Sequence, residues 1–368
     1  MPPTQFMKFH NLNQIVESFC GTKPARIRTI DRDSEGFSGA VVLRVVVPDK
    51  LHGSEVEYCL RGWPPESFSR ERLTGLHRLL AFVHKSGVKQ VPVPLRNKFG
   101  TTLYAEASQF WQMEPWMPGR ADFSSDPSDA RLRNAMSALA QWHEAASRFE
   151  PYPAEAGWFQ SQLFDKSPTV ADRLERIERY YTQDVANLRN LLAQTTTLGD
   201  WGQDFLELAD LSRRILDAFD RSVESIGSKL QSYCDVKFRL QPCLRDVWHD
   251  HVLFDGDQVT GLIDPNAAKT ESPATDLARL LGSFLGDDHD RWEFALTAYR
   301  QVRPLSDREA KVARVLDQST VLLSGLTWLE RLFVYKEDYA NPPRILTRLR
   351  QIVARLDRLT NRHQSVIL

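Results

Sequence analysis

A short strand–turn–strand segment, set inside an otherwise helical second half, constrains the fold of this chain more than any other feature. Residues 236–263 have the pattern of β structure, and Asp255-Gly256-Asp257 is a hairpin signal between the last two strand candidates. Helical periodicity flanks this segment on both sides. Antiparallel pairing would bring the start of one strand beside the end of the next. A plain helical bundle therefore does not account for this half.

The first part of the chain differs from the second, because strand patterns dominate it. One helix is expected at Glu71–Lys85, where apolar residues recur close to helical spacing. Helical patterns take over after residue 116, with start signals at SSDPSDARL and at Ser167-Pro168. The sequence thus predicts an α+β fold with a small β-rich lobe at 1–115 and a large, mainly helical lobe at 116–368. The strand candidates in the first lobe are residues 25–30, 39–47, 55–61, 102–107 and 110–113.

Composition excludes several classes of protein. A chain of 368 residues with 42% hydrophobic residues can build the cores of two lobes. The formal net charge is -1 with both signs mixed throughout, which argues against nucleic acid as a partner. We expect a cytoplasmic protein without membrane attachment, since the N-terminus lacks a signal-peptide layout and no apolar run reaches about 18 residues. The four cysteines are scattered and favour reduced thiols, and the sequence leaves the oligomeric state open.

The segment LRDVWHDHVLFDGDQVTGLIDP, residues 244–265, carries the most informative chemistry. Phosphoryl transfer needs a carboxylate facing the acceptor hydroxyl, ligands for a metal ion, and donors to the phosphates. Kinase catalytic loops place an Asp, then a metal ligand five positions on, then a hairpin that ends in a metal-binding Asp. Here Asp246 is followed by His251 and, after the hairpin, by Asp264. We expect these three side chains to converge on one small volume.

Residues 244–265 resemble the aminoglycoside phosphotransferase / choline kinase-like phosphotransferase superfamily. The usual sequence motif of that superfamily is HGDLHPGNVLF, followed by a strand ending in IDW or IDF. PATDLARLLGS, residues 273–283, is similar to the family's PAYDLA segment. The resemblance is specific only between Leu244 and Ser283. It implies a protein-kinase-like two-lobed fold and ATP- and Mg²⁺-dependent transfer to a hydroxyl of a small molecule. Asp246 would be the catalytic base and Asp264 a metal ligand, while Asp276 would support the loop.

Weaker matches in the first lobe agree in order and spacing. EGFSGAVVLRV resembles the family's phosphate-covering turn, and SQFWQMEPWMPGR resembles its hinge between the lobes. Arg61 stands where the family has the lysine that holds the α- and β-phosphates, and we expect Glu71 to be its ion-pair partner. The nucleotide-binding residues that the resemblance implies are Gly36, Ser38, Gly39, Arg61, Glu71, Met113, Glu114 and Trp116.

Three substitutions depart from the family pattern: Leu244 for His, Arg61 for Lys and His251 for the metal-binding Asn. Arginine can pair with phosphate, although its shape is not that of lysine. An imidazole can bind a metal, yet magnesium prefers oxygen ligands, so manganese is a possible alternative. A structural histidine at the mouth of the hairpin is equally consistent with His251.

Two hypotheses follow from different classes of function. The first is an ATP-dependent small-molecule kinase. The alternative is a catalytically weak or inactive kinase-fold protein that binds a nucleotide or metabolite, and the three substitutions motivate it.

The acidic cluster 287–290 is consistent with either a cationic acceptor or a charged loop between helices. The sequence identifies neither the acceptor nor the choice between ATP and GTP. HDH at 249–251 alone is a poor zinc signal, because no matching ligand set stands elsewhere.

Overall fold

The structure is a computed structural model, and it divides by internal contacts into two compact units. The first unit is Met1–Ser161 with Asp250–Lys269, and the second is Gln162–His249 with Thr270–Leu368. This division into units reflects internal contacts and does not test the predicted boundary between the lobes at residues 115 and 116, which stays a prediction. The residues described are 11–29, 40–49, 52–64, 66–106, 109–196, 201–337, 339 and 341–365, the last five of them without their side chains.

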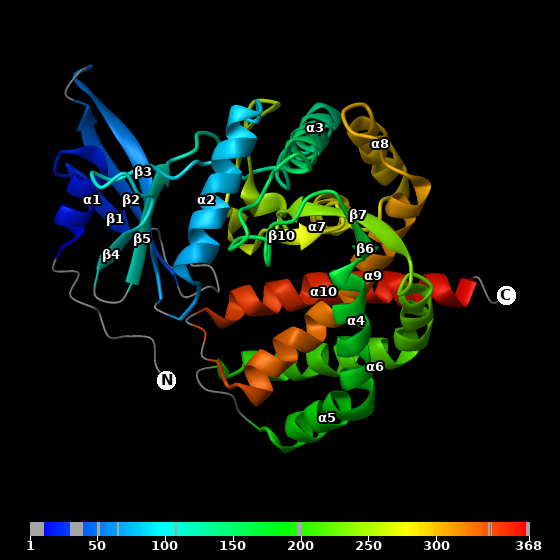
Figure 1. The fold of residues 1–368 in the computed structure, drawn as a ribbon. Helices are drawn as coiled ribbons and strands as arrows, with labels where there is room; N and C mark the ends of the chain where they lie inside the picture. Colours follow the sequence, from blue (N-terminus) through cyan, green and yellow to red (C-terminus); the bar gives the residue numbers. More distant parts are fainter. Residues whose placement is uncertain are drawn as a thin grey trace. The chain divides into compact units, whose positions relative to one another are not determined.

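A five-stranded antiparallel sheet forms the β-rich part of the first unit (Figure 1). Its strand order is β1-β2-β3-β5-β4, so the shortest strand lies at an edge and β3 lies in the middle. All five strands were predicted, with ends displaced by a few residues. The strands are β1 (Arg26–Thr29), β2 (Val41–Asp49), β3 (Ser54–Trp63), β4 (Tyr104–Glu106) and β5 (Gln109–Pro115).

Among the described residues of the first unit are the helices α1 (Leu12–Cys20), α2 (Arg70–Lys85) and α3 (Asp129–Ala146). The sequence predicted α2 and α3. Ser69 caps α2 by accepting from the amide of Arg72, and Ser128 caps α3 by accepting from the amide of Arg131. Helix α1 was not predicted. It buries Ile15 and other apolar residues in a core cluster with β2, β3 and β5.

The predicted hairpin is present as β8 (Val252–Asp255) and β9 (Gln258–Leu262), which pair antiparallel. Gly256 occupies the turn with φ +55°, a conformation that suits glycine. Arg120 and Phe254 exchange two backbone hydrogen bonds of 2.9 Å, which tie the hairpin to the chain after β5. Gly119 allows this approach, because a Cβ there would lie 2.7 Å from the Phe254 carbonyl oxygen.

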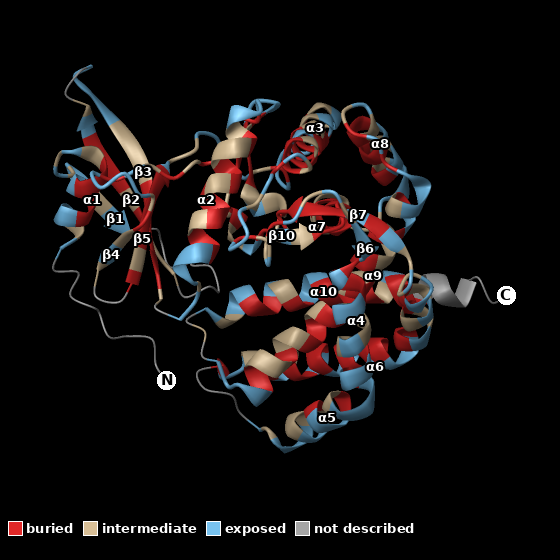
Figure 2. Ribbon diagram, viewed as in Figure 1, coloured by how far each residue is buried: buried red, intermediate tan, exposed pale blue. Residues whose placement is uncertain are grey.

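The second unit combines a small sheet with most of the helices. The sheet has the order β10-β7-β6, so β7 pairs with these strands and not with the hairpin. Helices α6, α7, α9 and α10 pack on one another through apolar faces, visible as buried stripes in Figure 2. Its elements are β6 (Leu163–Lys166), α4 (Pro168–Arg179), α5 (Val185–Gln194), α6 (Asp204–Gln231), β7 (Lys237–Cys243), β10 (Lys269–Glu271), α7 (Ala274–Leu285), α8 (His289–Arg300), α9 (Asp307–Leu329) and α10 (Pro342–Ser365).

A turn of π-helix at Tyr180–Asp184 follows α4, and another at Glu330–Val334 follows α9. The two turns contact each other through Tyr180, whose hydroxyl donates to Glu330 Oε2 at 2.5 Å. Within the described ranges, no helix combines the length and the apolar character that crossing a membrane requires.

Candidate active site

Arg61, near the end of β3, lies between two carboxylates within the first unit. Its Nη1 is 3.2 Å from Asp264 Oδ1, and its Nη2 is 3.9 Å from Glu114 Oε1. Only 9% of the Arg61 side chain is exposed, and Nε finds no hydrogen-bond partner among the described residues. A buried guanidinium is costly unless opposite charge lies beside it. The buried guanidinium of Arg61 is therefore held by the carboxylates of Asp264 and Glu114, and its Nε remains as a donor without a partner among the described residues.

A chain of buried polar side chains supports Glu114 through Oε2, the carboxylate oxygen other than the one near Arg61. Trp63 Nε1 donates to Gln112 Oε1 at 2.8 Å, and Gln112 Nε2 donates to Glu114 Oε2 at 2.9 Å. Burial raises the pKa of Glu114, while Arg61 and Gln112 act in the opposite direction. His77 Nε2 lies 3.0 Å from Gln112 Oε1, which can only accept. His77 is therefore protonated on Nε2, and its Nδ1 accepts from the Thr102 hydroxyl at 2.7 Å.

The buried His77 should make the stability of the protein depend on pH. Burial lowers the pKa of His77 to about 4, below the ordinary value of 6.5. As the pH falls from 6.5 to 4, the unfolded chain binds the proton first, so the free energy of unfolding should drop by roughly 3 kcal/mol. Urea unfolding across this range should show a smaller drop for His77→Gln than for the wild type. His52→Gln, at an exposed histidine, should keep the wild-type dependence; equal slopes in all three proteins would contradict the assignment.

Asp264 ends the hairpin in an unusual backbone conformation, with φ +56° and ψ +53°. Asn266 Nδ2 donates to Asp264 Oδ1, and His251 Nε2 is 3.8 Å from Asp264 Oδ2. The amide of Ile263 donates to the His251 carbonyl, so strand pairing fixes this proximity. The Asp264 side chain is 35% exposed. The hairpin thus presents a partly exposed carboxylate with a histidine beside it, a donor set that a divalent cation can use.

The expected ion pair between Glu71 and Arg61 is not formed. Glu71 lies exposed in the first turn of α2, and the ion pairs of Arg61 within the described ranges are those with Asp264 and Glu114. Arg61 stands opposite Gln112 in the sheet register, so Glu114 is its diagonal neighbour on the same face. The period-two alternation along β5 places Gln112 and Glu114 on one face of the strand. This pattern could identify Glu114 as the partner of Arg61 only if the pairing of β3 with β5 were already known.

The other predicted nucleotide contacts are placed as follows. Met113 lies in the core, and its carbonyl accepts from the amide of Leu95 at 2.7 Å. The amide of Trp116 donates to the Glu57 carbonyl at 3.1 Å. Gly36, Ser38 and Gly39 lie outside the described residues. The roles of these residues in binding a nucleotide stay predictions.

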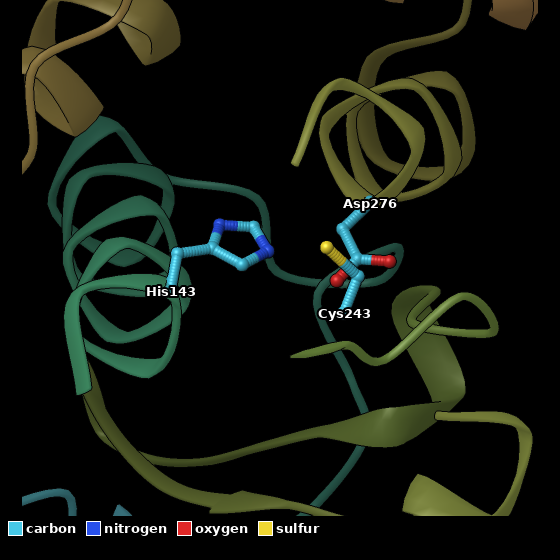
Figure 3. Close-up of side chains that lie close together, drawn as sticks. All are labelled: His143, Cys243 and Asp276. Carbon is cyan, nitrogen blue, oxygen red and sulfur yellow. The ribbon is translucent and has the colours of Figure 1, made fainter. Parts of the chain in front are cut away.

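Asp246 lies in the second unit, on a loop whose backbone is held by Asp276. The amides of Leu244 and Arg245 donate to the two oxygens of Asp276, at 2.7 and 2.6 Å. Arg245 has φ +63°, so these bonds fix a backbone conformation that few residues adopt. Figure 3 shows Asp276 projecting from α7 beside Cys243, which ends β7. Burial, followed by the charge of Asp276, raises the pKa of the Cys243 thiol. Asp276 thus supports the loop, as the sequence predicted.

Replacing Asp276 with asparagine should destabilise the protein. The amide side chain has one accepting oxygen, so one of the two backbone amides would lose its partner in a buried place. We expect the free energy of unfolding to fall by about 1–3 kcal/mol, measured by urea unfolding. Asp307→Asn, at an exposed carboxylate in the first turn of α9, is the control. A loss no larger than that of Asp307→Asn would show that the two bonds do not fix the loop.

Arg279 contacts Asp246 directly. It lies one turn after Asp276 on α7, and its Nη2 donates to Asp246 Oδ1 at 2.7 Å. This contact was not predicted, because nothing in the sequence pattern shows which face of α7 meets the loop. The expected convergence of Asp246 with Asp264 stays a prediction, since the two belong to different units.

The acidic cluster 287–290 takes part in local structure. Asp287 accepts from Arg355 and Arg358, at 3.2 and 2.8 Å. Asp288 caps α8 by accepting from the amide of Arg291 at 3.1 Å. These contacts favour the interpretation of the cluster as a charged loop between helices over its interpretation as a binding site for a cationic acceptor.

Comparison with known proteins gives both a family and a fold. The sequence profile described as "Phosphotransferase enzyme family" matches residues 29–309. No curated protein matches the chain significantly. The resemblance seen in the sequence is therefore confirmed at the level of the family.

Solved structures similar to this one are phosphotransferases with a protein-kinase-like fold, which confirms the predicted fold class. An amicoumacin kinase in complex with AMP-PNP and Ca²⁺ has a TM-score of 0.59 and 13% identity, covering 94% of this chain and 92% of that one. A spectinomycin phosphotransferase in complex with ADP and spectinomycin has a TM-score of 0.56 and 13% identity, with coverage of 95% and 100%. A microcompartment-associated aminopropanol kinase has a TM-score of 0.53 and 16% identity, with coverage of 96% and 97%.

Proposed function

Because the chain belongs to the phosphotransferase enzyme family, we propose that it transfers the γ-phosphoryl group of ATP to a hydroxyl of a small molecule. The observation that carries this proposal is the Arg61–Asp264 contact of 3.2 Å, which joins a buried cation to the carboxylate at the end of the hairpin. A phosphate-binding cation and a metal-binding carboxylate are the two parts that phosphoryl transfer requires around the triphosphate. The need for ATP makes the cytoplasm the expected location.

Arg61, Asp264 and His251 have the chemistry to hold a nucleotide–metal complex. Arg61 Nε is a buried donor with no partner among the residues described, and Asp264 is partly exposed, so both groups fit such a ligand. Arg61 would exchange Asp264 for phosphate oxygens, which frees the carboxylate to bind the cation together with His251. Mg²⁺, or Mn²⁺ in view of the imidazole, would neutralise charge on the phosphate oxygens.

Asp246 would act on the acceptor. Its Oδ1 accepts from Arg279 while Asp276 holds the loop on which it stands, so the carboxylate is fixed before substrate binds. A fixed carboxylate can orient the acceptor hydroxyl and take its proton late in the transfer. Most of the rate would come from positioning and charge neutralisation.

A second candidate is a protein that binds a nucleotide or metabolite without transferring phosphate. The replacement of the family's metal-binding asparagine by His251 favours it, because magnesium prefers oxygen ligands to an imidazole nitrogen.

Transfer of label from γ-³²P ATP or GTP, with Mg²⁺ or Mn²⁺, distinguishes the two candidates. We expect metal-dependent labelling of at least one acceptor in a panel of amino sugars, amino alcohols, sugars, nucleosides and hydroxy acids. A labelled product would exclude the second candidate. Nucleotide binding without any labelled product would overturn the proposed function and support the second candidate.

A further inference from the structure

A buried arginine in the first turn of α2 contacts the loop that follows Asp264. Arg72 Nη2 donates to the carbonyl oxygens of Ala268 and Asn266, at 2.5 and 3.1 Å. A 3₁₀ turn at Pro265–Ala267 begins directly after Asp264, so these two hydrogen bonds reach the middle of the turn and the residue that follows it. The guanidinium of Arg72 therefore fixes this turn against α2.

The helix itself does not explain why an arginine stands at this position. The N-terminus of a helix carries a partial positive charge, so a cation in the first turn is unfavourable. Burial of a guanidinium is also costly, and only 7% of Arg72 is exposed. Its contacts offset these costs: the guanidinium carbon lies 4.6 Å from the centroid of the Phe159 ring, and Nη2 bonds the turn. The contacts of Arg72 with the turn thus account for its position better than α2 does.

Asn266, in the middle of the turn, connects it to the carboxylate of Asp264. Asn266 Nδ2 donates to Asp264 Oδ1, the same oxygen that lies 3.2 Å from Arg61 Nη1. The other oxygen, Oδ2, is 3.8 Å from His251 Nε2. The two oxygens of Asp264 therefore face different groups, Oδ1 the two donors and Oδ2 the histidine.

We propose that Arg72 and Asn266 are positioning residues for a divalent cation at Asp264, an inference that rests on the proposed nucleotide–metal site. Arg72 holds the turn, and Asn266 keeps Oδ1 engaged so that Oδ2 faces the cation beside His251. When Arg61 leaves Asp264 for the phosphate oxygens, Oδ1 loses one of these two donors. Asn266 remains, so the carboxylate keeps its orientation when the cation binds. Replacing a residue that orients a metal ligand typically weakens metal binding by about ten- to a hundredfold.

Calorimetry of ADP binding with and without Mn²⁺ tests this inference without any transfer of phosphate. The ratio of the two Kd values measures how much the metal strengthens nucleotide binding. We expect this ratio to be large in the wild type and to fall by about tenfold or more in Arg72→Met and in Asn266→Ala. The Kd for ADP without metal should stay close to the wild-type value in both variants. Arg72→Lys keeps a charged donor without the planar fork, so its ratio should lie between those of the wild type and Arg72→Met.

Arg78→Met is the matched control for a purely structural role. Arg78 is also on α2 and also stacks on aromatic rings, but its hydrogen bonds go to Glu155 and Glu150. Arg78→Met should lower the free energy of unfolding and keep the wild-type ratio. Circular dichroism checks the folding of every variant, and Asn266→Ala, at a partly buried side chain, carries the test if Arg72→Met does not fold.

Three outcomes would overturn the inference. They are a wild type in which Mn²⁺ does not strengthen ADP binding, folded variants of Arg72 and Asn266 that keep the wild-type ratio, and a loss of the ratio in Arg78→Met as large as in Arg72→Met. A ratio that depends on Arg72 and Asn266, in a protein that transfers no phosphate, would support the inference and contradict the proposed phosphotransfer instead.

Discussion

Replacing Asp246 with asparagine should lower kcat for phosphotransfer by about two to four orders of magnitude, with nucleotide binding retained. Asparagine has the same shape and can still accept from Arg279, yet its amide cannot take a proton from the acceptor hydroxyl. The loop should keep its conformation, because Asp276 holds it through the backbone amides of Leu244 and Arg245. Initial rates at saturating ATP and acceptor measure the effect.

The matched control for this prediction is Asp255→Asn, at the exposed turn of the hairpin. It makes the same chemical change and should alter kcat by less than about twofold, as surface substitutions usually do. An Asp246→Asn protein that is folded, binds ATP and turns over at the wild-type rate would show that Asp246 is not the base.

Arg61 should control the use of ATP. Replacing Arg61 with methionine keeps the length of the side chain and removes the charge, and we expect kcat/KM for ATP to fall by about a hundredfold or more. The loss has two sources: the phosphates lose a donor, and the buried Glu114 loses the opposite charge beside it. Steady-state kinetics with ATP as the varied substrate gives this ratio.

Arg61→Lys separates charge from shape. Lysine restores a positive charge without the planar fork, so its kcat/KM for ATP should lie between those of the wild type and Arg61→Met. Arg26→Met, at an exposed position on β1, should leave kcat/KM unchanged. If Arg61→Met and Arg26→Met behaved alike, the phosphate contact assigned to Arg61 would be wrong.

Much of the fold could be predicted from the sequence, because it depends on local patterns. A dense β-branched run predicts β2, and period-two alternation of polar and apolar residues predicts β3. The Asp-Gly-Asp turn predicts the β8–β9 hairpin, and the Ser167-Pro168 pair predicts the start of α4. Helix α1 was missed because its nine residues make too short a periodic pattern. Its packing against the sheet stabilises it, and that packing is tertiary.

The candidate site was harder to predict, because its contacts depend on which elements become neighbours. Glu114 is a partner of Arg61 because β5 lies next to β3 in the sheet, and this register makes Glu114 the diagonal neighbour of Arg61. Gln112 joins Glu114 to His77, which comes from α2, so this network also depends on which elements become neighbours. Arg279 stands in the PATDLARLLGS segment, whose match indicates a supporting role for Asp276 and says nothing of the arginine one turn later.

Thermal unfolding with and without nucleotide and metal tests the central claim most directly. The proteins are the wild type, Asp264→Ala and the control Asp255→Ala, each with ATP or GTP and with Mg²⁺ or Mn²⁺. A ligand at 100 times its Kd stabilises the folded state by about 2.7 kcal/mol, which gives a readable rise in Tm. The account predicts a metal-dependent rise in the wild type and in Asp255→Ala that is absent in Asp264→Ala. No rise in any protein, or an equal rise in all three, would contradict a nucleotide–metal site built on Asp264.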